Sequence, residues 1–228
     1  AKEPAPPMGR TASGKRFVVP VTHDIFESIM DPRCWGISEV FTVVVLLFHC
    51  STLLLLRTLP IAFYVAQFLS YRIGYNLLLG VILHFQSHES AVTKWLSNAR
   101  PETRKLIKRI VSASMGSDYS WNKVPIEFNA WLVFRVLAMH ILANDGLTYL
   151  ILAAKLMHRP SYAPIYLVLG VVACVATAAL SFWSKMAAHN ILGDFAWNWG
   201  DFFFLMEGDL TFDGVFEYFP HPMYTVGY

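Results

Sequence analysis

The sequence predicts an all-α polytopic membrane protein with about four transmembrane helices, interfacial helices and a cytosolic acidic and aromatic C-terminal segment. Of the 228 residues, 55% are hydrophobic and only 15% are charged, whereas charged residues make up about a quarter of ordinary soluble domains. Several nearly uncharged stretches reach the roughly 20 residues that a helix needs to cross the hydrocarbon layer of a membrane. A soluble globular domain is therefore excluded.

Residues 1–37 are predicted to form a cytosolic N-terminal segment. The first fifteen residues are rich in Pro and Gly, so we expect them to be disordered. After them, Thr22 or Asp24 can cap a short amphipathic helix that ends before Pro32. No cleavable signal peptide is visible, because the first long apolar run starts only after about forty residues.

Residues 38–85 are predicted to form a transmembrane hairpin. A nearly uncharged run covers 38–56, and a second apolar run covers 61–83. The connection between them is too short for anything but an antiparallel pair of helices.

Metal and disulfide sites are not predicted. His84 and His88 lie one helical turn apart at the end of the second apolar run, but only Glu89 adds a possible ligand nearby. The three cysteines contain no C-x-x-C motif, and their odd number argues against both a disulfide framework and a zinc site.

Residues 86–126 are predicted to form a basic cytosolic loop with an amphipathic helix. Between 103 and 115 the apolar residues fall on one helical face and the cations on the other. Such a helix either lies on an anionic membrane surface or packs on its own protein, and both alternatives stay open. Most of the 18 Lys and Arg lie in this loop, the N-terminal segment and the C-terminal segment, which the positive-inside rule places in the cytosol.

Residues 127–185 are predicted to form a second transmembrane hairpin. Its first stretch, 127–156, is too long for an upright span, so a tilt, a kink near Gly146 or a break are all compatible with it. Its second stretch, 163–183, is rich in Ala, Gly and Val, and small residues let neighbouring helices approach closely.

Charged side chains occur inside these apolar stretches. Arg72 lies near the middle of the second run, and Arg135 and Asp145 lie in the third. A charge at this depth is costly, so it marks a functional site, a lipid contact or an internal ion pair. We assign Arg72 and Arg135 to lipid binding, while Arg135 or Asp145 could instead meet Arg72 or an acid elsewhere.

The last forty residues, 189–228, contain six acids and no Lys or Arg, and they are dense in Phe, Trp and Tyr. Carboxylates supply negative charge and aromatic faces attract cations, so this segment suits an organic cation. Asp194 and Asp201 lie seven residues apart within a repeated Gly-Asp-Phe, a spacing that on one helix places both acids on the same face. A turn is predicted at 212–214.

Two motifs in this segment carry a family resemblance: G-D-F-F-F-L-M-E-G-D-L-T-F-D-G-V-F over 200–216 and P-H-P-M-Y-x-x-G-Y over 220–228. Together they closely resemble the fungal phosphatidylethanolamine N-methyltransferases, membrane enzymes of the phospholipid methyltransferase family. The shorter H-P-x-Y-x-x-G element is also similar to a cassette of isoprenylcysteine methyltransferases and sterol reductases. The resemblance implies that 186–228 are the start of a methyltransferase cofactor and substrate cassette, and that the chain is an N-terminal portion of the enzyme.

By this resemblance, the protein transfers a methyl group from S-adenosylmethionine to the amine of phosphatidylethanolamine, the first step of phosphatidylcholine synthesis. The implied location is the endoplasmic reticulum membrane, and the implied partners are phosphatidylethanolamine and membrane lipids, without nucleic acid. Because the cassette stops at Tyr228, we expect the isolated chain to be inactive or severely impaired. The resemblance assigns cofactor binding to His221, Pro222, Met223, Tyr224 and Gly227.

Methyl transfer to an amine also requires a proton acceptor. A lipid ammonium that behaves like that of lysine has a pKa of about 10, so it must lose a proton before it can attack the methyl group. Glu207, Asp201 and His189 are the candidate catalytic residues, because an acid or histidine at the level of the headgroups can accept that proton.

Two alternatives remain open. The first is another membrane enzyme with the same cassette, such as an isoprenylcysteine methyltransferase or a sterol reductase. The second is a non-enzymatic transporter that uses Arg72, Arg135 and Asp145 as an intramembrane ion path. Internal inverted repeats would favour a transporter, and the sequence shows none.

Overall fold

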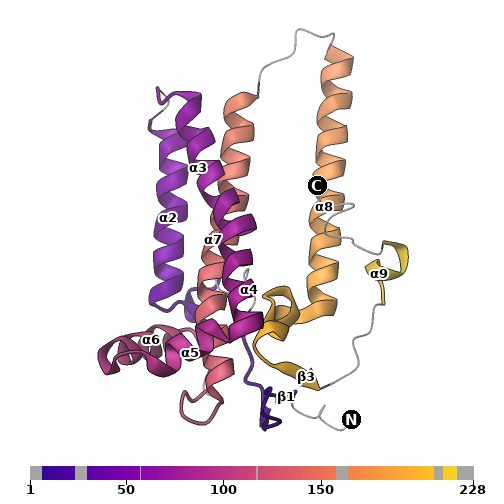
Figure 1. The fold of residues 1–228 in the computed structure, drawn as a ribbon. Helices are drawn as coiled ribbons and strands as arrows, with labels where there is room; N and C mark the ends of the chain where they lie inside the picture. Colours follow the sequence, from indigo (N-terminus) through magenta and orange to yellow (C-terminus); the bar gives the residue numbers. More distant parts are fainter. Residues whose placement is uncertain are drawn as a thin grey trace. The chain divides into compact units, whose positions relative to one another are not determined.

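The computed structural model divides into two compact units, which are described separately (Figure 1). Unit 1 comprises 1–156 and 198–208, and unit 2 comprises 157–197 and 209–228. Among the residues that the structure describes, four helices are long and apolar enough to cross a membrane, which confirms the predicted all-α polytopic class. The structure describes residues 7–23, 30–56, 58–116, 118–157, 164–207 and 213–219.

Three of the four candidate spans belong to unit 1. Helix α2 covers Ile37–Leu54, and α7 covers Ile126–Leu156 as one continuous helix of 31 residues. The remaining span starts as α3 (Ile61–Ile73), passes through the π-helical segment η2 (Gly74–Leu78) and continues as α4 (Leu79–Glu89). Both α2 and α3 pack against α7. Helices thus cover most of the two apolar runs 38–56 and 61–83, and the open question about 127–156 is answered by an unbroken helix.

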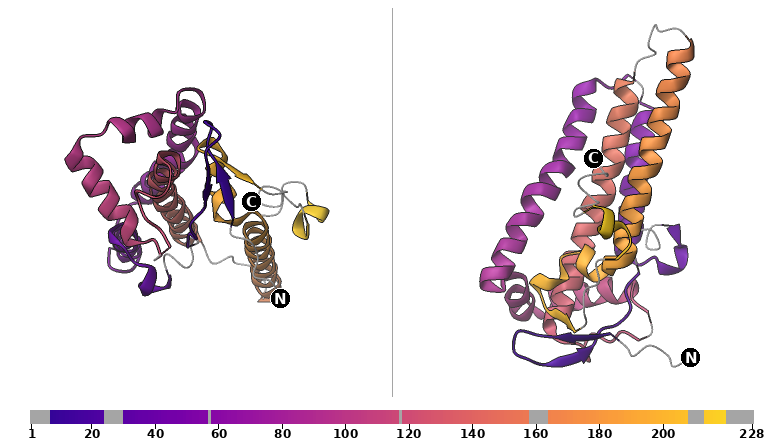
Figure 2. Two further views of the ribbon diagram at one scale, coloured as in Figure 1. Left: turned by 90° about the horizontal axis from the view of Figure 1, so that it is seen from below. Right: turned by 90° about the vertical axis from the view of Figure 1, so that its right-hand side faces the viewer.

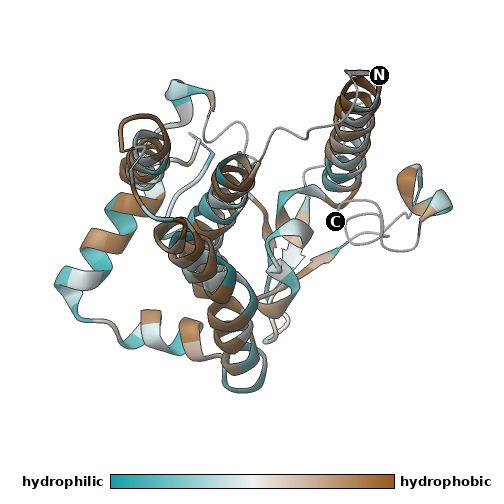
Figure 3. Cartoon of the chain, turned by 90° about the horizontal axis from the view of Figure 1, so that it is seen from above, coloured by the Kyte–Doolittle hydropathy of each residue, from teal (hydrophilic) through white to brown (hydrophobic). Residues whose placement is uncertain are grey.

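Two short helices follow the α3–α4 span at one end of unit 1. They are α5 (Ala91–Asn98) and α6 (Pro101–Ala113), and both alternate between polar and apolar residues along their length (Figure 3). Helix α6 confirms the predicted amphipathic helix, and its Val111 is buried where α6 packs against α2 and α7. Leu106 on the same helix is exposed, so α6 is only partly covered by its own protein.

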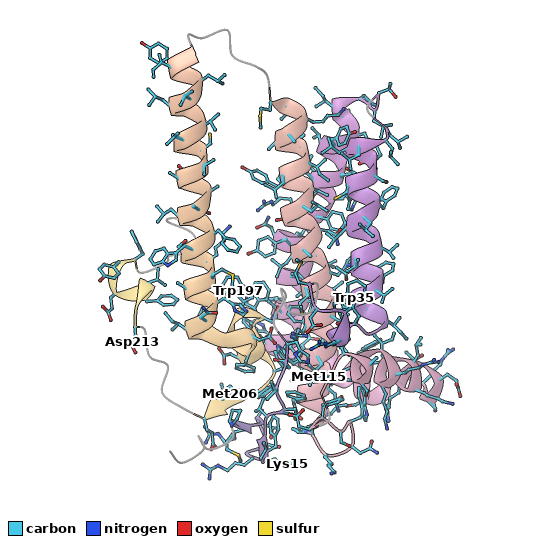
Figure 4. The ribbon with its side chains drawn as sticks, turned by 180° about the vertical axis from the view of Figure 1, so that it is seen from behind. Lys15, Trp35, Met115, Trp197, Met206 and Asp213 are labelled. Atoms are coloured by element: carbon cyan, nitrogen blue, oxygen red, sulfur yellow. The ribbon has the colours of Figure 1, made fainter. Side chains whose placement is uncertain are left out.

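A small antiparallel sheet lies at the same end of unit 1 (Figure 2). Its strands are β1 (Met8–Arg10), β2 (Arg16–Val18) and β3 (Leu205–Glu207), in the order β2-β1-β3. Figure 4 labels Met206 on β3 and Lys15 on the turn that joins β1 to β2. The prediction of disorder for the first fifteen residues is therefore wrong for those from position 7 onward.

The sheet is ordered by side chains and by its distant partner strand. Gly9 lies against the Phe17 side chain so closely that a Cβ added to it would be 2.9 Å from the ring. The Phe17 ring packs in turn on the rings of Phe128 and Phe204, with centroids 5.9 and 5.2 Å away. This aromatic packing joins the sheet to the first turns of α7, and Pro and Gly content alone does not reveal it.

Unit 2 contains α8 (Pro164–Trp197) and the short α9 (Val215–Tyr218), which packs on α8. Gly193 interrupts α8 with a φ of 70° and a ψ of 169°. The helix ends at Trp197, and Asp201 lies in a separate 3-10 turn. The prediction that Asp194 and Asp201 share one helical face is therefore wrong, because the helix ends between them at Trp197.

Two other predicted features are only partly covered by the described residues. Gly214 precedes α9 with a φ of 64°, in keeping with the predicted turn, while position 212 lies outside the described residues. The amphipathic helix predicted after Thr22 also lies outside them, except for its last residue, Met30.

Candidate functional site

The turn that follows α8 in the sequence belongs to unit 1 and carries Asp201. Its centre is the 3-10 helix η3 (Gly200–Phe202), closed by hydrogen bonds from the Phe203 and Phe204 amides to the Gly200 carbonyl at 2.8 and 3.2 Å. Trp199 begins the turn with a φ of 52°, a left-handed conformation that is rare for a residue with a side chain. Such a conformation persists only where neighbouring contacts hold it.

Buried Gln86 on α4 makes some of the contacts that keep this turn in its conformation. Its side-chain amide donates hydrogen bonds to the Thr93 hydroxyl at 3.1 Å and to the Phe202 carbonyl at 3.3 Å. Its carbonyl oxygen accepts the backbone N–H groups of Val92 and Thr93 at 3.0 and 3.3 Å. One side chain therefore connects α4, the first turn of α5 and the turn that carries Asp201.

Aromatic rings hold the same turn from the side of α7. The Phe134 ring lies 5.5 Å from the Phe203 ring and 6.2 Å from the Trp199 ring. The indole of Trp131, one turn earlier on α7, donates a hydrogen bond to the Asn198 carbonyl at 3.1 Å. The backbone on both sides of Asp201 is thus fixed, while the Asp201 side chain itself is exposed. No other described residue forms a hydrogen bond or an ion pair with its carboxylate.

Glu207 has a different environment, because it ends β3 and pairs with Arg16 on β2. Arg16 Nε donates a hydrogen bond to Glu207 Oε1 at 2.6 Å. This bond lowers the pKa of the Glu207 carboxyl below its ordinary value and raises that of the Arg16 guanidinium. Because the folded-state carboxyl pKa is the lower one, the pair contributes stability at neutral pH and loses it as the pH falls through that lowered pKa.

His189, the third candidate catalytic residue, belongs to unit 2. It lies on α8 and is buried, and its ring meets the Trp197 ring edge-on with centroids 4.9 Å apart. Its Nε2 atom has no hydrogen-bond partner in the described part of the chain. The three candidates therefore do not form one described cluster: Asp201 and Glu207 lie in unit 1, and His189 lies in unit 2.

Arg72 and Arg135, the predicted lipid-binding residues, both contact protein groups. Arg72 Nε lies 3.1 Å from Asp145 Oδ1, an ion-pair contact rather than a well-aligned hydrogen bond, and it joins α3 to α7. The Arg72 guanidinium also lies 5.1 Å from the centre of the Phe68 ring. Arg135 is buried and donates a hydrogen bond to the carbonyl of His23. The internal ion pair left open by the sequence is present, and lipid binding by either arginine stays a prediction.

Polar side chains also connect α2 to its neighbours. His49 Nε2 lies 3.2 Å from the Tyr71 hydroxyl, and its Nδ1 lies 3.0 Å from Gln67 Nε2. The Thr42 hydroxyl oxygen on α2 lies 3.1 Å from His140 Nδ1 on α7. The sequence analysis did not predict this network or the role of Gln86. In the sequence these residues appear only as occasional polar residues within apolar stretches. This pattern does not show which residues they contact.

The remaining predictions for the site concern histidines and the cofactor element. His84 and His88 are exposed with rings 4.4 Å apart, and His88 Nδ1 bonds the His84 carbonyl of its own helix. Within the described ranges, no group of three or more His, Cys, Asp or Glu could hold a metal ion. The predicted cofactor-binding residues lie outside the described residues: His221, Pro222, Met223, Tyr224 and Gly227.

Comparison with known proteins gives consistent matches. Residues 166–228 match the family described as phospholipid methyltransferase. The chain is 37% identical over 236 residues to the phosphatidylethanolamine N-methyltransferase of Trichophyton verrucosum, covering 97% of this chain and 24% of that protein. It is 39% identical over 238 residues to the enzyme of the same name from Aspergillus fumigatus, covering 96% of this chain and 26% of that protein.

These matches have a defined extent. The chain spans about a quarter of the length of the curated relatives it matches. No solved structure matches it. The resemblance found in the motifs is thus confirmed: nearly the whole chain is related to a part of the fungal phosphatidylethanolamine N-methyltransferases, and residues 166–228 carry the sequence pattern of the phospholipid methyltransferases.

Proposed function

We propose that this chain is part of an S-adenosylmethionine-dependent phosphatidylethanolamine N-methyltransferase that carries out the first methylation toward phosphatidylcholine. The observation that carries the proposal is the similarity of nearly the whole chain to fungal enzymes of that name, together with the family match over 166–228. The four apolar helices agree with a substrate that resides in a membrane.

Asp201 is the described residue best suited to meet the amine of the substrate. Its carboxylate is exposed, and no described residue neutralises it, whereas the Glu207 carboxylate is engaged by Arg16. A carboxylate beside Trp and Phe rings stabilises an ammonium group and can accept its proton. The amine then attacks the methyl group in line, so that the main tasks of the protein are to align the reactants and to exclude water.

S-adenosylmethionine would supply the methyl group. We assign its binding to the segment from His221 to Gly227, on the resemblance of that motif. The buried Nε2 of His189, without a partner in the described part, is a second group available for a proton or a ligand. We place the enzyme in the endoplasmic reticulum membrane, with the basic loop and the Asp201 turn facing the cytosol, where S-adenosylmethionine is available.

The proposal is tested by following a labelled methyl group from S-adenosylmethionine into lipids. The chain is expressed within its native polypeptide in membranes that lack endogenous phosphatidylethanolamine methylation, and the lipid products are separated. We expect monomethylated phosphatidylethanolamine, and we expect Asp201→Asn to lower its formation by roughly 10²-fold or more. Glu102→Gln, which changes an exposed acid on α6, is the matched control.

Two results would contradict the proposal. Absence of any methylated lipid from a folded, inserted protein would exclude the enzyme and favour a transporter. Methylation of prenylated peptides, or reduction of sterols, would instead assign the protein to one of the other membrane enzymes with a similar cassette. Normal methylation by Asp201→Asn would remove Asp201 from the proposed mechanism.

A further inference from the structure

Unit 1 contains an apolar groove between α4, α5 and α7. Its volume is about 400 Å³, within the range of pockets that hold small ligands. Three residues come from each helix, and none of them carries a charge or a polar side-chain group apart from the indole N–H of Trp95. Val81, Ile82 and Phe85 lie on α4, Ala91, Val92 and Trp95 on α5, and Val133, Phe134 and Leu137 on α7.

The groove lies where hydrocarbon is the expected surrounding. Two of its walls belong to candidate membrane spans, Ile61–Glu89 and Ile126–Leu156. Its residues occupy the last turns of α4 and the early turns of α7, so it lies toward the end of the spans where α5 begins. Trp95, on the amphipathic α5, is 51% exposed, and such indoles are favoured at the boundary between hydrocarbon and headgroups.

The groove shares one residue, Phe134, with the packing around the turn that carries Asp201. Phe134 lines the groove and also packs on Trp199 and Phe203, which lie two residues before and two residues after Asp201 in the sequence. Gln86, next to the groove residue Phe85, bonds the Phe202 carbonyl. Residues of the groove and next to it therefore support the backbone of the turn that carries the Asp201 carboxylate.

We infer that this groove seats one acyl chain of an amine-bearing phospholipid, with the ammonium headgroup at Asp201. The inference rests on the proposed function and adds to it the part of the protein that holds the substrate tail. The uncharged lining matches a hydrocarbon chain. The exposed carboxylate, which no described residue neutralises, matches a cationic headgroup.

The two parts of this site have different tasks. A lipid tail gains no hydrophobic free energy when it moves from the bilayer into an apolar groove, because both surroundings are equally apolar. The groove therefore fixes the position of the tail by shape, and selection among lipids comes from the headgroup. A tail held at a fixed place relative to Asp201 brings the amine to a defined position, which is the condition for rapid transfer.

The experiment uses the native polypeptide in vesicles of phosphatidylcholine with a trace of phosphatidylethanolamine that carries a photoactivatable diazirine on one acyl chain. Crosslinked residues are identified by mass spectrometry. We expect labelling to concentrate on groove residues and to fall several-fold in Leu137→Trp, which fills the groove. Leu150→Trp, a substitution of the same kind at an exposed position of α7 outside the groove, should leave the labelling unchanged.

A second arm tests the headgroup. The same diazirine chain on phosphatidylglycerol should label the groove several-fold less than on phosphatidylethanolamine, and Asp201→Asn should remove this difference. Labelling spread over all exposed apolar positions, or equal labelling by both lipids, would overturn the inference. Methyl transfer that continues without groove labelling overturns only the inference, whereas selective groove labelling without methyl transfer overturns the proposed function and leaves the lipid site in place.

Discussion

At the scale of single residues, two acids that look equivalent in the sequence have different surroundings in the structure. Asp201 and Glu207 lie six positions apart in one motif, but only Glu207 has a guanidinium partner among the described residues. That partner keeps Glu207 ionised and holds it in the sheet, which favours positioning of the cassette over proton transfer. Asp201 has a fixed backbone and an exposed side chain. These are the properties expected of a residue that contacts a substrate.

Reversal of the ion pair tests this difference. Arg16→Glu or Glu207→Arg alone places like charges across the sheet, so we expect faster proteolysis within 8–18 and a lower rate of methyl transfer. The exposed pair is weak, so the loss should be no more than several-fold. The double reversal should restore both measurements. If the double reversal restores resistance to proteolysis but methyl transfer remains low, Glu207 is a catalytic residue after all.

At the scale of elements, the Arg72–Asp145 contact joins two candidate membrane spans, Ile61–Glu89 and Ile126–Leu156. The exposed fractions of the two side chains are 26% and 11%, so neither charge is well solvated. Removing one partner leaves an uncompensated charge, while removing both leaves an apolar contact between α3 and α7. The contact thus supports the packing of these two helices whatever lipid lies outside them.

A double-mutant cycle measures this coupling. We expect Asp145→Leu alone to lower the free energy of unfolding in mixed micelles by about 3 kcal/mol, because the partly buried Arg72 is left without its counter-ion. Arg72→Met together with Asp145→Leu should lie within about 1 kcal/mol of the unchanged protein. Arg33→Met, at an exposed position, is the control. Additive losses in the double variant would show that the two charges do not interact.

The same elements show what a sequence can and cannot predict. The spans were predictable because an apolar run of sufficient length has few alternatives in a membrane protein, and α6 because its apolar residues follow the helical period. The strands were not, because three residues carry no usable period and β3 pairs with residues almost the whole chain away. The end of α8 before Asp201 was missed because a seven-residue repeat looks helical. The Arg16 partner of Glu207 and the bond from Gln86 to the Asp201 turn were not predictable, because each joins residues that are far apart in the sequence.

At the scale of the whole molecule, charge distribution predicts a definite orientation. In unit 1 the sheet, α5, α6 and the Asp201 turn gather at one end of the spans, and the connection between α2 and α3 lies at the other (Figure 1). The first end carries most of the basic residues of the unit. The positive-inside rule therefore assigns that end to the cytosol.

Cysteine labelling tests the orientation. In a background without native cysteines, Lys15→Cys and Lys105→Cys should react with a membrane-impermeant maleimide added from the cytosolic side of sealed microsomes. Leu59→Cys, in the connection between α2 and α3, should react only after the membrane is opened with detergent. Reaction of Leu59→Cys in sealed microsomes, without reaction at the other two positions, would reverse the assigned orientation.

The late arrival of β3 has a consequence for biosynthesis. Arg16 and Glu207 are 191 positions apart, so a ribosome that adds 5–20 residues per second completes β3 on the order of ten to forty seconds after β2. During that interval β1 presents an unpaired edge, and a lone two-stranded hairpin is only marginally stable in water. The sheet can close only after all the spans of unit 1 have left the ribosome. Its closure is therefore a late step in the maturation of the nascent chain.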